Sequence, residues 1–145
     1  MRAALYTGKG GAEVIAFADV PEPAIGPDDA LVEVAYAGLN RADVLERMGR
    51  YPAPRLDPPV PGLEFSGVVR AVGANVRNVT PGDRVCGLVA AGAHAEFVAA
   101  DALTLARVPD SEIRSSGGDR AHLQPAGHPR LAGPIWRRVA TERSV

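Results

Sequence analysis

The 145-residue chain is poor in cysteine, in basic excess and in long apolar runs. Cys86 is its one cysteine, which excludes an internal disulfide framework and a cysteine-rich zinc site. The 16 basic and 17 acidic side chains give a net charge of -1, without the basic excess typical of nucleic-acid-binding proteins. No apolar run approaches the roughly 18 residues of a membrane span, and the N-terminus lacks the apolar core of a signal peptide. We therefore expect a cytoplasmic protein that binds neither nucleic acid nor membranes.

Lysine is also scarce, because Lys9 is the single lysine among the 16 basic residues. Charge is unevenly distributed along the chain. Residues 1–110 carry 10 basic and 14 acidic side chains, whereas residues 111–145 carry 6 basic and 3 acidic ones. The second segment also shows no sustained helical or strand period. We therefore predict a folded domain over residues 1–110, followed by a largely unstructured tail over residues 111–145.

Residues 1–110 contain short apolar segments separated by turn signals, such as the glycines of residues 8–11 and the Pro-Gly-Asp sequence of residues 81–83. Strands at this spacing, with few helices between them, are typical of an antiparallel barrel or sandwich. The expected fold is therefore mainly β. The strands that the pattern predicts span residues 3–6, 14–20, 31–37, 67–72, 84–88, 95–100 and 103–108.

One short helix is predicted between the third and fourth of these strands. Asn40 can cap its N-terminus, Asp43 at the third helical position suits the positive helix end, and Gly49 is a natural stop. Because Asn40, Asp43 and Arg47 are three and four residues apart, they project from the same side of the helix. The apolar face would be formed by Val44, Leu45 and Met48.

The residues best suited to chemistry lie on this helix and just after it. They form a polar series, Asn40, Asp43, Arg47 and Tyr51. A purely structural interpretation of this series is a capped helix with a surface ion pair between Asp43 and Arg47. Glu64 lies in an otherwise apolar turn, where a carboxylate is costly unless it is hydrogen-bonded or ion-paired. Arg47 is a candidate partner for Glu64.

Other motifs indicate ordinary structure. The glycines at positions 8, 10 and 11 complete neither of the phosphate-binding glycine patterns and are predicted to form a hairpin turn. His94, His122 and His128 have no metal-ligand spacing with Cys86, so we expect no metal site. Cys86 lies in an apolar strand and is expected to be packed rather than reactive.

Four stretches carry a resemblance to a known family: LNRAD (39–43), RMGRYP (47–52), PGLEFSG (61–67) and PGDRV (81–85). Their residues, order and spacing resemble the N-terminal GroES-like domain of the medium-chain dehydrogenase/reductase superfamily, in its zinc-free quinone oxidoreductase branch. Within that branch the chain is most similar to NADPH quinone oxidoreductases of the p53-inducible type. The resemblance covers about three quarters of the chain and implies a partly open β-barrel with one short helix.

The resemblance implies hydride transfer from NADPH to a quinone or another small activated carbonyl compound. Zinc-dependent relatives have a cysteine at the position of Asn40 and a histidine at the position of Leu63, so the implied chemistry uses no metal. Tyr51 and Asn40 would then be the catalytic hydrogen-bond donors, and Asn40 would also lie on the nicotinamide side of the cofactor. The residues that would hold them in place are Asp43, Arg47 and Glu64.

The resemblance ends near residue 110, where family members continue into a Rossmann domain and later return to complete the first domain. A chain that stops before that domain is expected to be inactive alone, because most cofactor contacts are missing. Residues 114–119 have synonymous codons that, read one base later, encode an alanine-rich segment like that of the family. We therefore hypothesise a frameshift near Ser111, which the nucleotide sequence would test.

A different class of function is also compatible with this sequence. The chain can be a non-catalytic remnant or an interaction module, because the face that normally packs on the Rossmann domain should be apolar and adhesive. Such a face could also support a homo-oligomer. A ring subunit like that of the co-chaperonins shares the fold name, but no motif of the sequence supports it.

Overall fold

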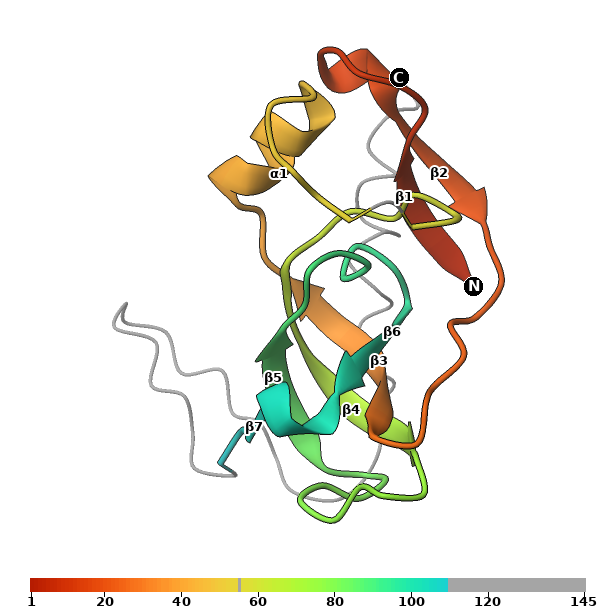
Figure 1. Cartoon of the computed structure of the whole chain (residues 1–145), viewed down its shortest axis with the longest axis vertical. Helices are drawn as coiled ribbons and strands as arrows, with labels where there is room; N and C mark the ends of the chain where they lie inside the picture. The colour runs from red at the N-terminus through yellow and green to blue at the C-terminus, as the bar shows by residue number, and fades with distance from the viewer. Residues whose placement is uncertain (55, 110–145) are drawn as a thin grey trace, which may run out of the picture.

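The computed structural model describes residues 1–54 and 56–109, which form two antiparallel β-sheets and one α-helix (Figure 1). Within these residues no helix is long and apolar enough to cross a membrane. The predicted tail over residues 111–145 lies outside the described part. In chain order the elements are β1 (Arg2–Tyr6), the 3-10 helix η1 (Ala12–Val14), β2 (Ile15–Asp19), β3 (Asp29–Ala37), α1 (Arg41–Arg47), β4 (Glu64–Val72), β5 (Arg84–Leu88), β6 (Phe97–Asp101), the 3-10 helix η2 (Ala102–Thr104) and β7 (Leu105–Arg107).

The larger sheet has five strands in the order β6-β3-β4-β5-β7, and the smaller one is the β1-β2 hairpin. β6 and β7 are edge strands, so the sheet does not close on itself. This confirms the predicted mainly β, partly open architecture. A bridge between Ala3 and Ala95 joins the hairpin to the segment that precedes β6. In Figure 1 the hairpin and α1 lie together at one end of the molecule, beyond the larger sheet.

Valine provides most of the core, as its preference for pleated, half-buried surfaces leads one to expect. The most deeply buried side chains include Val32, Val69 and Val85, one from each of the three central strands. Each contributes roughly 1.5–3 kcal/mol through removal of its side chain from water. The pairing of β3 with β4 also requires Gly67, because a Cβ at this position would lie 2.0 Å from the carbonyl oxygen of Glu33.

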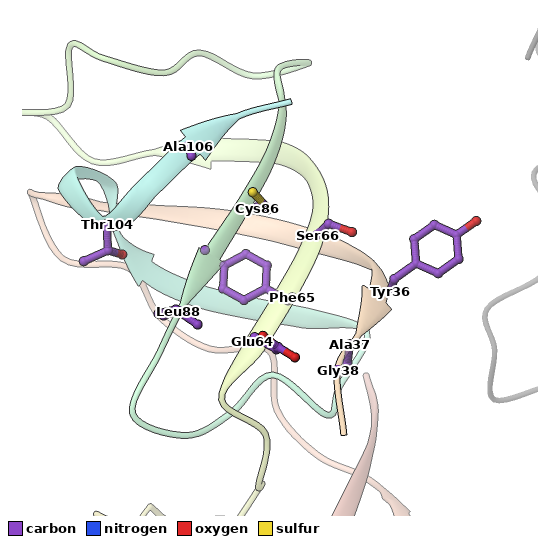
Figure 2. A pocket seen from close by; sticks show the side chains of 11 residues that line it. Tyr36, Ala37, Gly38, Glu64, Phe65, Ser66, Cys86, Leu88, Thr104 and Ala106 are labelled. Carbon is purple, nitrogen blue, oxygen red and sulfur yellow. The ribbon is translucent and has the colours of Figure 1, made fainter. Parts of the chain in front are cut away.

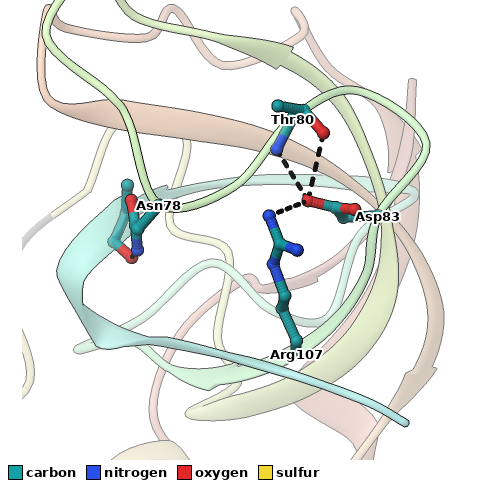
Figure 3. Close-up of polar contacts among 5 residues, drawn as sticks. Asn78, Thr80, Asp83 and Arg107 are labelled. Carbon is teal, nitrogen blue, oxygen red and sulfur yellow. Dashed lines mark hydrogen bonds and ion pairs between the residues drawn. The ribbon is translucent and has the colours of Figure 1, made fainter.

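A turn at residues 80–83 holds β7 against the rest of the sheet (Figure 3). Asp83 Oδ2 accepts hydrogen bonds from the backbone N–H of Thr80 at 2.8 Å and from its hydroxyl at 3.2 Å. The same oxygen lies 2.9 Å from Nη2 of Arg107, the last residue of β7. The Pro-Gly-Asp sequence was predicted to turn the chain, and its carboxylate also fixes an edge strand.

Most predicted strands are confirmed with shifted ends. The strand predicted over residues 84–88 matches β5. The strand predicted over residues 31–37 begins earlier, at Asp29, because Asp29 pairs with Asp101 of β6. The strand predicted over residues 103–108 is divided between η2 and β7. This division arises because the Asp101 side chain accepts the N–H of Leu103 at 2.9 Å and so begins a 3-10 turn.

The predicted helix is confirmed as α1, with Asn40 at its N-cap. The prediction of its inward face was wrong. Val44 and Met48 are exposed, and Asp43 is the one buried residue of α1. The helix therefore turns its polar side toward the protein, and the reason is found in the residues that face it.

Candidate functional site

The connection from β3 to α1 is fixed at both of its ends. The N–H of Gly38 donates to the backbone oxygen of Glu64 at 3.1 Å, and the carbonyl oxygen of Gly38 lies 3.0 Å from Nε2 of His94. Two residues later, the N–H of Asn40 donates to Oδ2 of Asp43 at 2.6 Å. This is the carboxylate half of a capping box, and it holds Asn40 at the start of the helix.

Asp43 is buried, with 4% of its surface exposed, so it does not form the surface ion pair with Arg47 that a purely structural interpretation predicts. Within the described residues, no ion pair connects Asp43 with Arg47, or Arg47 with Glu64. The backbone oxygen of Asp43 instead accepts the hydroxyl of Tyr6 at 3.0 Å. Oδ1 of Asp43 has no hydrogen-bond partner in the described part of the chain.

Further polar groups surround Asp43 below the helix. Burial, and then the charges of Asp43 and Glu46, raise the pKa of Tyr6 to about 12, while Arg47 acts in the opposite direction. Burial and the charge of Asp43 also raise the pKa of Glu46, which His94 lowers. The hydroxyl of Tyr6 contacts Asp43, and the charges of Asp43, Glu46, Arg47 and His94 act on Tyr6 or on Glu46. We call Tyr6, Asp43, Glu46, Arg47 and His94 the α1 polar cluster.

The α1 polar cluster explains why α1 turns its polar side inward. Oε2 of Glu46 and Nη1 of Arg47 are buried there without a hydrogen-bond partner in the described residues. A buried polar group without a partner costs about 1–3 kcal/mol, so the unpartnered groups of the cluster lower the stability of the folded chain. Sequence reasoning assigned no role to Tyr6 or Glu46. It considered His94 only as a metal ligand.

Two grooves open beside this region. The larger, of about 680 Å³, lies over the ends of β3, β4 and β5, and Figure 2 shows Phe65 at its centre with Tyr36 pointing away. The smaller, of about 290 Å³, contains Tyr51 and Leu63. Leu88 lines both grooves, so they adjoin. We call them the sheet groove and the Tyr51 groove.

The predicted site residues are divided between these places. Tyr51 is exposed in the Tyr51 groove, and Glu64 lines the sheet groove (Figure 2). Asp43 and Arg47 belong to the α1 polar cluster. Asn40 lines neither groove, but its N-cap position is tied through Gly38 to the backbone of Glu64.

The prediction for Cys86 was wrong. Its thiol is exposed and lines the sheet groove. The physical reason is the strand period of two, because Val85 is fully buried and its neighbour must point to the opposite face.

The glycine cluster forms the connection of a hairpin, as predicted, since it lies between the paired strands β1 and β2. The N–H of Gly11 donates to Oε1 of Glu13 at 2.6 Å, so this N–H is already hydrogen-bonded to a carboxylate of the chain. The described residues contain no group of three or more His, Cys, Asp or Glu side chains arranged to hold a metal ion.

Residues 26–110 match the family described as the alcohol dehydrogenase GroES-like domain. Among characterised proteins, a pikromycin polyketide synthase component of Streptomyces venezuelae is 44% identical over 113 residues, which is 78% of this chain and 3% of that protein. Quinone oxidoreductase-like protein 2 of Mus musculus is 41% identical over 91 residues, or 63% of this chain. The chain thus spans only 26% of the length of this mouse relative.

Solved structures show the same likeness. The human synaptic vesicle membrane protein VAT-1 homolog-like protein superposes with a TM-score of 0.73 at 33% identity, over 77% of this chain and 36% of that one. The quinone oxidoreductase of Escherichia coli, solved in complex with NADPH, superposes with a TM-score of 0.71 at 30% identity, over 75% of this chain and 33% of that one. The chain therefore belongs to the alcohol dehydrogenase GroES-like domain family, and quinone oxidoreductases are among the proteins that it resembles.

Proposed function

We propose that residues 1–110 form the substrate-side domain of an NADPH-dependent oxidoreductase that reduces quinones or other small activated carbonyl compounds. In this proposal residues 111–145 are a separate tail. The observation that carries it is the likeness to the E. coli quinone oxidoreductase, whose structure contains NADPH. Residue identity and fold both support this assignment over three quarters of the chain.

We propose that the described residues meet the nicotinamide end of NADPH and not its pyrophosphate. A pyrophosphate needs several free N–H donors or cationic side chains. In the glycine-rich loop of residues 8–11, the carboxylate of Glu13 already accepts the N–H of Gly11 and would repel a phosphate. The amide side chain of Asn40 and the apolar grooves suit the uncharged nicotinamide end. We therefore propose that a nucleotide-binding domain must complete the site.

NADPH, when bound, supplies the hydride. The residues of this chain would then stabilise the negative charge that develops on the carbonyl oxygen of the substrate. Neutral donors can do this without a metal if they are fixed before the reaction begins. In our proposal the phenol of Tyr51 and the amide of Asn40 are these donors, and solvent delivers the proton.

The surroundings of these donors suit a metal-free mechanism. Leu63 presents a hydrocarbon side chain to the Tyr51 groove, where it can pack on a quinone ring but cannot bind a metal. Asp43 holds the N-cap through the N–H of Asn40. Glu64 and Arg47 are assigned supporting positions, Glu64 through its backbone oxygen on Gly38 and Arg47 through its place in the α1 polar cluster.

A quinone-binding experiment on the 145-residue chain tests this assignment. Tetramethyl-1,4-benzoquinone is a suitable probe, because it has no free ring position with which the exposed Cys86 thiol could react. We expect probe-induced NMR shifts at the side chains of Asn40 and Tyr51. Asn40→Ala and Tyr51→Phe should each weaken binding about three- to tenfold, the value of one hydrogen bond.

Tyr36 lines the sheet groove but its ring points away from it (Figure 2), so Tyr36→Phe is the matched control and should not affect affinity. Shifts confined to other residues would reject the proposed donors. NADPH absorbance measured with the same quinone tests the need for a second domain. We expect no turnover by the chain alone, and saturable turnover would contradict that requirement.

A second function, that of a non-catalytic interaction module, is favoured by the exposed apolar side chains near the grooves. Leu39 is 87% exposed, and Leu88 and Tyr36 are also open to solvent. Such a surface would bind a nucleotide-binding domain or a second copy of the chain. Sedimentation at several concentrations tests self-association. An apolar-to-polar change, Leu88→Ser, should weaken any dimer, while Ile15→Ser at an exposed position of β2, outside both grooves, serves as control.

A further inference from the structure

His94 is held rigidly in the structure. It is 6% exposed, its N–H donates to Pro61 at 2.9 Å, and its carbonyl oxygen accepts the N–H of Ala4 at 2.9 Å. Its ring lies against Gly62, which has a φ of 105°. A Cβ on Gly62 would lie 2.6 Å from Cδ2 of the ring, so only a glycine at this position leaves room for it.

Among the described residues, the side chain of His94 makes its hydrogen bond through Nε2, which lies 3.0 Å from the carbonyl oxygen of Gly38. A carbonyl oxygen can only accept a hydrogen bond, so Nε2 must carry a proton. The contact joins positions 56 residues apart in the chain. His94 thus holds the carbonyl group of Gly38, two residues before Asn40. The N–H of Gly38 is held separately, by the backbone oxygen of Glu64.

We propose that His94 is a positioning residue, whose Nε2–H holds the Gly38 carbonyl and thereby places Asn40 for its hydrogen bond to the substrate. This inference rests on the proposed function, in which Asn40 is the donor. Gly38 directly follows β3 and its N–H is already bound by Glu64, so the contact with His94 is what restrains its carbonyl group. Without His94, its carbonyl loses its side-chain partner and the connection can shift.

The distinction between positioning and bulk packing can be made with two variants. His94→Phe keeps an aromatic ring of similar size but has no donor. His94→Gln has an amide N–H at about the reach of Nε2 and should restore the hydrogen bond. We expect His94→Phe to weaken binding of tetramethyl-1,4-benzoquinone about threefold or more, as expected for the misplacement of one hydrogen-bond donor, and His94→Gln to recover most of that loss.

A double-mutant cycle with Asn40→Ala shows whether His94 acts through Asn40. In the Asn40→Ala background, His94→Phe should have no further effect on quinone affinity. Equal effects of His94→Phe with and without Asn40 would overturn the proposal, because they would show that packing alone is lost.

Nitrogen-15 NMR gives a test that does not need quinone binding, and its first part uses the wild-type chain alone. Nε2 of His94 should carry a proton, and a ring protonated only at Nδ1 would overturn the proposal. In His94→Phe the backbone amide of Gly38 and the side-chain amide of Asn40 should shift, and in His94→Gln they should return. If quinone fails to bind the wild type, the proposed function is wrong, whereas these NMR signals still decide whether His94 positions Asn40.

Discussion

The turn at residues 80–83 allows a quantitative test of what fixes the open edge of the larger sheet. Asp83→Ala removes an acceptor that binds the N–H and the hydroxyl of Thr80 and the guanidinium of Arg107 (Figure 3). β7 has three residues and pairs only with β5, and Leu105 is its one residue buried in the core. Loss of the carboxylate should therefore loosen both the turn and the edge strand.

The expected magnitude follows from exposure. The side chain of Arg107 is 58% exposed and that of Asp83 is 24% exposed, so water screens their ion pair to about 1 kcal/mol or less. Thr80 is exposed as well, and water can replace the carboxylate at its N–H and hydroxyl. We expect Asp83→Ala to lower the free energy of unfolding by about 1–2 kcal/mol in total. Each kcal/mol corresponds to a fall in Tm of roughly 4–8 °C for a domain of this size.

Urea unfolding of four chains measures this effect: wild type, Asp83→Ala, Arg107→Ala and the double variant. The coupling energy of the cycle should be at most about 1 kcal/mol. Asp19→Ala is the matched control, since Asp19 is exposed at the end of β2, and it should cost less than about 0.5 kcal/mol. An Asp83→Ala loss no larger than that of the control would refute the role of the turn. A coupling energy above about 2 kcal/mol would refute the argument from exposure.

Local patterns were sufficient to predict most of the elements. β5 follows from a Pro-Gly-Asp turn and the alternating apolar residues after it. The start of α1 follows from the N-cap residue Asn40. The order of the strands could not be derived in this way. β6 lies beside β3 although more than fifty residues separate them, and this pairing depends on which edges are free after the other strands have met.

The inward face of α1 shows why part of the site could not be predicted. An amphipathic pattern locates the apolar side of a helix, but it does not reveal what the helix will meet. Tyr6 reaches Asp43 across 37 residues of sequence, and His94 reaches Gly38 across 56. Such contacts leave no periodic pattern in the sequence. The sequence therefore indicated Val44, Leu45 and Met48 as the buried face, although the residues that α1 meets are polar.

Two further predictions concern the α1 polar cluster. Tyr6 should ionise near pH 12, because burial and the charges of Asp43 and Glu46 raise its pKa to about 12. A tyrosinate absorbance titration of the wild type should show this late step, and Tyr6→Phe should lack it. The pKa of Glu46 is raised first by burial and then by the charge of Asp43, so the unfolded chain releases this proton at a lower pH than the folded chain. Glu46 therefore lowers stability as the pH rises through the carboxyl range. Glu46→Gln should be more stable than wild type in urea at neutral pH and should lose that advantage in acid. Glu22→Gln, at an exposed position, is the matched control. A pH-independent effect of Glu46→Gln would show that burial of the Glu46 charge is not what destabilises the folded chain.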